Sequence, residues 1–291
     1  MRTIGGVASV LPFGNPLTNP LEQVMNKKLV LGGGIGAVVV LIAAVWFLFF
    51  RNDAPEEVSV DAANAQLDED LAAAAEEDAG DDAEADDDMA EEDSAADAPA
   101  DEGFDGDVSG TWIVDDEIGS FDFETASGSF AGFRVDEELT VGEVVAVGRS
   151  GGVTGSLTID GGQLTDADIT VDMTTIVSND SRRENAIRGA VGASENPTAT
   201  FVLTAPVELP DGIRDGEVVT VDAVGDLTVN GVTNSVTFTI SALVRDDGFG
   251  VITGSTNIVF EDFDVTPPSA PIVVSIDDNG IVEFQLIVTK G

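Results

Sequence analysis

The chain contains neither His nor Cys, so pairs of acidic residues are the first candidates for acid–base chemistry or metal binding. Catalytic triads with His, His-ligated metals, thiolate sites and disulfides are therefore excluded. Adjacent residues on a strand point to opposite faces, so an Asp-Asp pair does not converge on one site. The pairs that precede Gly or Asn-Gly are typical of hairpin loops. The sequence predicts no enzyme, no metal site and no cofactor. The three pairs are Asp115-Asp116, Asp246-Asp247 and Asp277-Asp278.

Basic residues are scarce and therefore informative. The chain has 12 Lys+Arg against 55 Asp+Glu, a net charge of −43, which excludes a nucleic-acid binder with a basic face. Arg182, Arg183 and Arg188 fall together in residues 180–193, which predict a short helical excursion with Asp180 or Ser181 as its N-cap. These arginines are candidates for contacting a phosphate, a pyrophosphate or a quinone oxygen of a ligand. The alternative is that they pair with surface carboxylates.

The elements that must position such groups are strands, because residues 108–291 alternate between apolar and polar side chains. Asn230-Gly231 lies between two alternating runs, which is a strong signal for a β-hairpin. Thr, Val, Ile and Phe dominate the runs, and Gly or Asp-Gly separates them. The sequence thus predicts an all-β, antiparallel domain. Further alternating runs occupy residues 121–124, 167–173, 198–204, 257–262 and 282–288.

A single β domain of this length must protect its sheet edges, and closure into a barrel does so. The interior of an eight-stranded barrel is either just filled by side chains or able to hold one small ligand. The length of the domain favours a cavity. Ordinary core packing is the alternative for any single Phe in the runs. The candidates for lining the cavity are Phe121, Phe123, Phe201, Phe238, Phe260 and Phe284.

Three stretches of distinct composition precede this domain. Residues 1–28 contain helix-breaking prolines and are expected to form a cytoplasmic leader. Residues 29–50 lack charge and are long enough to cross a bilayer as one transmembrane helix. The bulky residues 46–51 at the end of this run argue against the alternative of a cleaved signal peptide. Residues 51–107 are acidic and Ala-rich and are expected to form a disordered linker, with cation or partner binding as the alternative.

The distribution of basic residues predicts the orientation of the span. The positive-inside rule places the N-terminus in the cytoplasm and residues 51–291 outside, as a single-pass protein of the cell membrane. Gly32 and Gly36 have the GxxxG spacing of packed membrane helices. This pattern leaves open a homodimer through that helix face or through the barrel. The basic residues that flank the span are Arg2, Lys27 and Lys28 before it and Arg51 directly after it.

Six segments resemble, in order, landmarks of the YceI-like family, also called the lipid- or polyisoprenoid-binding domain. The most specific is GDLTVNGVTNSVTF (225–238), which is similar to G-x-L-T-[IL]-x-G-x-T-x-x-V. The resemblance covers about residues 110–290. The other five segments are GTWIVD (110–115), SFAGFRV (129–135), ITVDMTTIVSND (169–180), ENPTATFVLT (195–204) and IVFEDFDV (258–265).

The resemblance implies an eight-stranded, lipocalin-like barrel and places Phe133, Met173 and Ile176 beside its cavity. One segment departs from the family pattern. Where the family has R-D-x-H-L, this chain has Arg183, Glu184, Asn185, Ala186 and Ile187. A role for that His in holding a polar head group is therefore absent from this chain.

Together these features predict a membrane-tethered, extracytoplasmic protein that carries or sequesters a long-chain isoprenoid or another lipid. Each buried CH₂ group of such a chain contributes about 0.8 kcal/mol, so binding needs no catalytic group. The alternative function is a filled β-barrel scaffold for protein interaction or envelope structure, without lipid.

Overall fold

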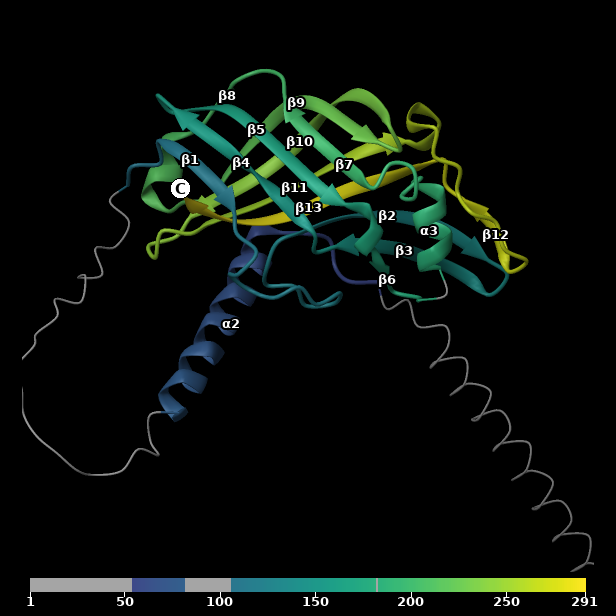
Figure 1. The fold of residues 1–291 in the computed structure, drawn as a ribbon, viewed down its shortest axis with the longest axis horizontal. Coiled ribbons are helices and arrows are strands. Elements are labelled where there is room, and N and C mark those ends of the chain that lie inside the picture. Colours follow the sequence, from purple (N-terminus) through teal and green to yellow (C-terminus); the bar gives the residue numbers. More distant parts are fainter. Residues whose placement is uncertain (1–53, 82–105, 182) are drawn as a thin grey trace, which may run out of the picture. The chain divides into compact units, whose positions relative to one another are not determined.

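The computed structural model describes residues 54–81, 106–181 and 183–291. Among these residues, no helix is long and apolar enough to cross a membrane, and the predicted leader (1–28) and span (29–50) lie outside them. The helices, shown with the strands in Figure 1, are α2 (Val60–Asp81), α3 (Glu184–Ala190) and the 3-10 helices η1 (Met173–Thr175), η2 (Asp211–Asp215) and η3 (Phe260–Phe263). The strands are β1 (Gly110–Val114), β2 (Phe130–Leu139), β3 (Gly142–Ser150), β4 (Val153–Asp160), β5 (Gln163–Asp172), β6 (Val177–Ser178), β7 (Thr198–Leu203), β8 (Val207–Glu208), β9 (Val219–Val229), β10 (Val232–Val244), β11 (Gly250–Val259), β12 (Val273–Ile276) and β13 (Asn279–Lys290).

Eight of these strands close into an antiparallel barrel, as the sequence predicts. The ring runs β1, β4, β5, β7, β9, β10, β11 and β13, and pairing of β13 with β1 closes it. In the closing pair, Trp112 lies opposite Lys290 and Val114 lies opposite Val288. Closure leaves no open sheet edge in the ring.

Strand β13 pairs with two partners on the same edge and so extends one side of the barrel. Residues 281–285 pair with β2, whereas residues 288–290 pair with β1. Where the partner changes, the Ser129 hydroxyl accepts a hydrogen bond from the Ile287 amide at 3.0 Å. Strands β3 and β6 continue from β2, and β12 also pairs with β2. This extension lies beside α3 (Figure 1).

The predicted hairpin is confirmed. Asn230 and Gly231 have φ angles of 52° and 75° between β9 and β10, the left-handed values that a type I′ turn requires. The helical excursion is also confirmed as α3. Its N-cap is Arg183, without a side-chain cap, so the prediction of Asp180 or Ser181 at that position is wrong.

The run at residues 121–124 is not a strand, and here the prediction is wrong. Phe121 and Phe123 lie in the loop between β1 and β2. The Asp122 carboxylate accepts hydrogen bonds from the amides of Glu124 and Thr125 at 2.9 and 3.1 Å. Such local bonds hold the backbone in a turn and compete with strand pairing.

The prediction that residues 54–81 are disordered, as part of the linker, is also wrong. Helix α2 occupies most of this segment, and its Val60, Ala63 and Leu67 are buried against Leu243, Val251 and Ile287 of the barrel. Their spacing forms a narrow apolar stripe on an otherwise acidic helix. The amino-acid composition alone does not reveal this stripe. The remaining linker residues 51–53 and 82–105 lie outside the described residues.

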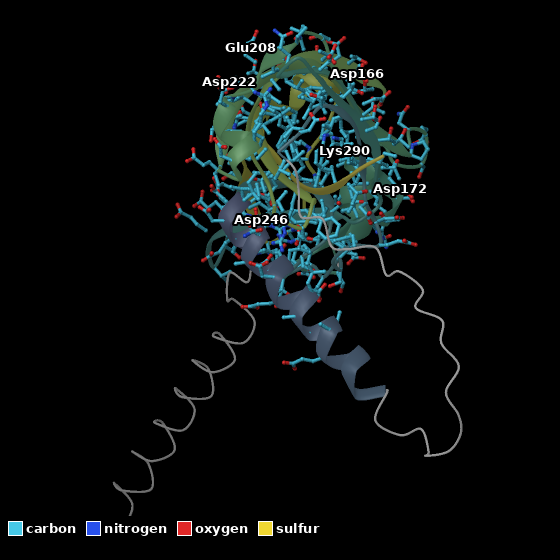
Figure 2. All side chains as sticks on the ribbon, turned by 90° about the vertical axis from the view of Figure 1, so that its left-hand side faces the viewer. Asp166, Asp172, Glu208, Asp222, Asp246 and Lys290 are labelled. Carbon is cyan, nitrogen blue, oxygen red and sulfur yellow. The ribbon has the colours of Figure 1, made fainter. Side chains whose placement is uncertain are left out.

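The charged side chains of the barrel lie mainly on its outside. Figure 2, which views the barrel from the end where β1 lies, shows Asp166, Glu208 and Asp222 on the periphery and carbon-rich side chains within. The alternation of strand side chains thus separates an acidic exterior from an apolar interior.

Candidate ligand-binding cavity

The barrel encloses an apolar cavity of about 520 Å³, within the range of small-molecule sites. All eight strands of the ring contribute to its lining. The cavity extends from Trp112 on β1 and Ile213 in η2 to Ile187 on α3 and Ile276 on β12. At the latter end, the lining residues Ser269 and Ile272 are exposed, so the cavity reaches the surface there.

Glycines keep this cavity open, because they let phenylalanine rings lie against the barrel wall. A Cβ atom at Gly254 would lie 2.5 Å from the Phe284 ring, closer than van der Waals contact permits. The same relation recurs on two other strand pairs. A ring that lies over a neighbouring strand occupies the place of a missing side chain and leaves the centre of the barrel free. The pairs are Phe133 with Gly148, Phe201 with Gly225 and Phe284 with Gly254.

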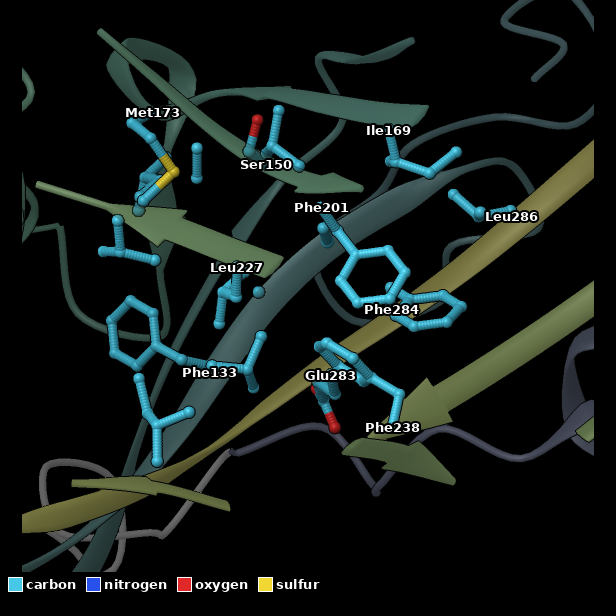
Figure 3. Close-up of a pocket in the computed structure, with 18 of the residues that line it drawn as sticks. Phe133, Ser150, Ile169, Met173, Phe201, Leu227, Phe238, Glu283, Phe284 and Leu286 are labelled. Atoms are coloured by element: carbon cyan, nitrogen blue, oxygen red, sulfur yellow. The ribbon is translucent and has the colours of Figure 1, made fainter. Parts of the chain in front are cut away.

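Three rings of the cavity lining, those of Phe201, Phe238 and Phe284, pack against one another (Figure 3). The centroids of Phe201 and Phe238 are 5.2 Å apart with an edge-to-face angle of 84°, and those of Phe238 and Phe284 are 5.4 Å apart. These are favourable aromatic geometries. Phe133 and Met173 lie further along the lining and pack on the buried cluster of Ile176 and α3.

Charged side chains gather at the α3 end of the cavity. Glu137 on β2, Asp180 and Arg183 all line it there. The Glu137 side chain is 10 % exposed, and its Oε2 atom lies 3.2 Å from Arg183 Nη1. The two charges attract at this distance, yet Oε2 accepts no hydrogen bond within the part of the chain that the structure describes. Burial raises the pKa of Glu137, and the Arg183 charge opposes that shift.

A second buried carboxylate lies on the opposite, outer face of the wall. Glu283 Oε1 accepts hydrogen bonds from Arg149 Nη2 at 3.0 Å and from Arg134 Nη1 at 3.5 Å. Arg149 reaches it across Gly132, where a Cβ atom would lie 2.9 Å from the Arg149 chain. Burial lowers the pKa of Arg149, and Glu283 opposes that shift. Although Glu283 contributes to the cavity lining, its parity directs its side chain outward, opposite to Phe284.

The segment before α2 completes this outer network. The Pro55 carbonyl accepts from Arg134 Nη2 at 2.6 Å, and the Glu56 carbonyl accepts from both Arg134 and Arg149 at 3.1 Å. Arg149 also lies 4.4 Å from the centroid of the Phe130 ring. The Arg134–Arg149–Glu283 network is therefore buried and is bonded to the backbone of the segment before α2.

The structure brings most of the predicted site residues to the cavity. Arg182 lies outside the described residues. The prediction that Phe121 and Phe123 line the cavity is wrong, since both lie in the loop between β1 and β2. Phe121 is 38 % exposed, and the Phe123 carbonyl accepts a hydrogen bond from Arg149. The predicted residues that line the cavity are Phe133, Met173, Ile176, Phe201, Phe238, Phe260, Phe284 and Arg183.

Arg188 lies on α3 but does not line the cavity. It donates to the Ile176 carbonyl at 2.7 Å and pairs with Glu184 at 3.7 Å, which matches the alternative of structural pairing. Glu137 is the main site residue that the sequence analysis missed. The available signal was its parity, since Phe133, Val135 and Glu137 occupy alternate positions on one strand.

Comparisons with protein families and with solved structures found similar proteins. Residues 122–288 match the YceI-like domain. BcnA from Burkholderia cenocepacia aligns at 20 % identity over 55 % of this chain and 96 % of that chain, with a TM-score of 0.43. A polyisoprenoid binding domain from Saccharophagus degradans, implicated in plant cell wall breakdown, aligns at 15 % identity over 62 % and 98 %, with a TM-score of 0.45. No curated protein matches the sequence.

The YceI-like match spans more than half of the chain and contains six of the eight strands that close the barrel, together with most of β13. It also contains Glu137, Arg183 and all three Phe–Gly pairs. The chain therefore belongs to the YceI-like family.

Proposed function

We propose that this protein binds one long apolar chain, an isoprenoid or another lipid, inside the barrel and carries or sequesters it. The observation that supports this proposal is the apolar cavity of about 520 Å³, which reaches the surface beside α3. Each CH₂ group that moves from water into it contributes about 0.8 kcal/mol. Membership of the YceI-like family supports the same class of ligand.

The Phe–Gly pairs favour this function over a filled scaffold. A filled barrel needs side chains that project into the centre, whereas Phe133, Phe201 and Phe284 lie over glycines of neighbouring strands. Since protein interiors are normally close-packed, a volume of this size is retained for an occupant.

Membrane attachment is the second part of the proposal, and it depends on the sequence. The uncharged residues 29–50 form the anchor, with the N-terminus in the cytoplasm and residues 51–291 outside. Protease added to spheroplasts should then digest the barrel, whereas protection until permeabilisation would reverse the topology. A homodimer through Gly32 and Gly36 or through the barrel stays a prediction.

Lipid analysis of the full chain tests the ligand proposal. The protein is isolated from its own membrane in polymer discs without detergent, and the associated lipids are identified by mass spectrometry. Ala223→Phe places a ring inside the cavity, because Ala223 is buried and lines it. Val224→Phe is the matched control, since Val224 is 40 % exposed on the same strand.

We expect one lipid species that is enriched with the wild type and the Val224 variant and depleted with Ala223→Phe. The disc supplies the same background of bilayer lipids to all three proteins, so the difference reports the cavity alone. Identical lipid profiles for the three folded proteins would contradict binding in the barrel.

A further inference from the structure

Glu137 is a buried carboxylate at the α3 end of a mainly apolar cavity, where Asp180 and Arg183 also form part of the lining. Ser150, another polar lining residue, already donates to the Asp172 carbonyl at 2.8 Å and contacts the Thr175 hydroxyl at 2.7 Å. The Glu137 Oε2 atom, in contrast, is buried without a hydrogen bond among the described residues. A buried acceptor without a donor costs stability unless another molecule supplies the donor.

Arg183 adds a complementary group at the same place. Its Nη1 lies 3.2 Å from Glu137 Oε2, and both residues line the cavity beside α3. A hydroxyl that lies beside both groups can donate to the carboxylate and accept from the guanidinium. A primary amide can do the same with its N–H and its carbonyl.

On the basis of the proposed function, we propose that Glu137 and Arg183 form the subsite for the polar head of the bound chain. The subsite selects a neutral head with a hydrogen-bond donor, such as a hydroxyl or primary amide, over an anionic head such as a carboxylate or pyrophosphate. The apolar tail extends from there along Phe133 towards Trp112. An anionic head would place a second negative charge against Glu137 in a region of low dielectric, which is unfavourable.

The same contact has a purely structural interpretation, in which the ion pair only attaches α3 to β2. The two interpretations differ in their effect on ligands. A structural pair influences stability and treats all ligand heads alike. A head subsite changes the order of affinity among ligands that share one chain and differ only in the head.

Retinoids provide such a series, because one isoprenoid chain is available with an alcohol, a carboxylate or a plain hydrocarbon end. Energy transfer from Trp112 to the polyene reports occupancy of the cavity, since Trp112 lines it. Trp46 is the other tryptophan of the chain and is replaced by Phe in every protein. The full chain is reconstituted in phosphatidylcholine vesicles. Each variant is compared with the reference for the same retinoid, so differences in membrane partitioning cancel.

The variants are Glu137→Leu, Glu137→Gln and the control Glu138→Gln. Glu138 is exposed on the outer face of the same strand. We expect Glu137→Leu to weaken retinol roughly five- to tenfold, as for one lost hydrogen bond, and to leave the hydrocarbon unchanged. Glu137→Gln should retain retinol and bind retinoic acid more tightly than the reference, whereas Glu138→Gln should change nothing.

Two results would overturn the subsite, and a third would overturn the function beneath it. If Glu137→Leu alters alcohol, acid and hydrocarbon equally, Glu137 is structural. If Glu137→Leu does not fold, Glu137→Gln still decides, because unchanged discrimination between retinol and retinoic acid contradicts the subsite. Absence of energy transfer from Trp112 with every retinoid would contradict binding in the cavity itself.

Discussion

Two carboxylates are buried in the wall of this barrel, one on each face, and their surroundings differ. Glu283 faces outward and is enclosed by Arg134 and Arg149, whose remaining donors bind the carbonyls of residues 55, 56 and 123. Glu137 faces the cavity, has one arginine at 3.2 Å, and keeps an oxygen without a hydrogen bond among the described residues. The outer site is satisfied by the protein, and the inner site is not.

This difference separates structural from functional burial of charge. Removal of one member of a fully bonded buried network leaves its partners uncompensated, so the network resists change. A carboxylate with unused bonding capacity next to a cavity has a place for another molecule. The bonded outer network and the inner oxygen without a hydrogen bond among the described residues lead to the following predictions, in order of decreasing expected effect on stability.

Glu283→Gln should have the largest effect. The substitution leaves Arg134 and Arg149 buried without a counter-charge, and a broken buried ion pair typically costs about 3–5 kcal/mol. Chemical denaturation of the full chain, followed by Trp fluorescence, measures the loss. The same substitution at exposed Glu138 is the control and should change the unfolding free energy by under about 0.5 kcal/mol. Equal stability of the two variants would remove the structural role assigned to Glu283.

Leu67→Ala should come next, because it tests the segment that covers the outer network. Leu67 is fully buried between α2 and the barrel, and truncation of a buried Leu costs about 2–5 kcal/mol. Glu69→Ala, at an exposed position of the same helix, is the control. Unfolding measured by circular dichroism should separate the two.

The same variant offers a test without denaturant. A protease site introduced within residues 82–105 allows the chain to be cut between α2 and β1. The two fragments of the wild type should stay together through the α2 contacts and the Pro55 and Glu56 carbonyls, whereas Leu67→Ala should weaken their association. Complete separation of the wild-type fragments would show that α2 is not part of the folded unit.

Gly254→Ala, a substitution on the inner face of the barrel wall, should have an intermediate effect on stability. The new methyl group meets the Phe284 ring and must displace it into the cavity. Such overpacking typically costs about 1–3 kcal/mol, and the displaced ring should also weaken binding of a long chain. Gly142→Ala is a poor control because its φ is 140°, whereas Gly189→Ala is suitable, since open space surrounds Gly189 on α3. A stable Gly254 variant with unchanged ligand binding would contradict the proposed role of the Phe–Gly pairs.

Glu137→Gln should have the smallest effect on stability, and the effect depends on pH. Burial raises the pKa of Glu137 above its ordinary value of 4.5, while Arg183 opposes the shift. Between the unfolded and folded pKa values, the unfolded chain binds fewer protons, so Glu137 makes the protein less stable as pH rises through this window. The Gln side chain does not titrate, so the variant lacks this pH dependence. Unfolding free energies from about pH 4 to about pH 8 should therefore show the wild type losing stability relative to the variant as pH rises. A constant difference would contradict the shift.

Regular alternation made the barrel predictable from the sequence. The Asn230-Gly231 turn, strands β5, β7 and β13 and helix α3 follow local rules of period and turn chemistry. The run at 121–124 failed because Asp122 bonds to nearby amides and forms a turn. Helix α2 was missed because its stability comes from three buried side chains among many acidic ones.

The candidate site was predictable to the same degree. Apolar parity identified Phe201, Phe238 and Phe284, since each lies in a run whose apolar face is buried. Parity does not show that a neighbouring strand places Gly beside a ring, because register is a tertiary property. Parity with Phe133 and Val135 places Glu137 on the inner face of β2, but only packing shows that its carboxylate is buried there.

The most direct test of the contrast is a crystal structure of the full chain purified from its own membrane without added lipid. We predict continuous, elongated density in the cavity, with its polar end next to Glu137 and Arg183 and its tail beside Phe238 and Phe284. Glu283 should keep its ion pairs with Arg134 and Arg149. A cavity closed by side chains, or an occupant whose polar head lies away from Glu137, would contradict it.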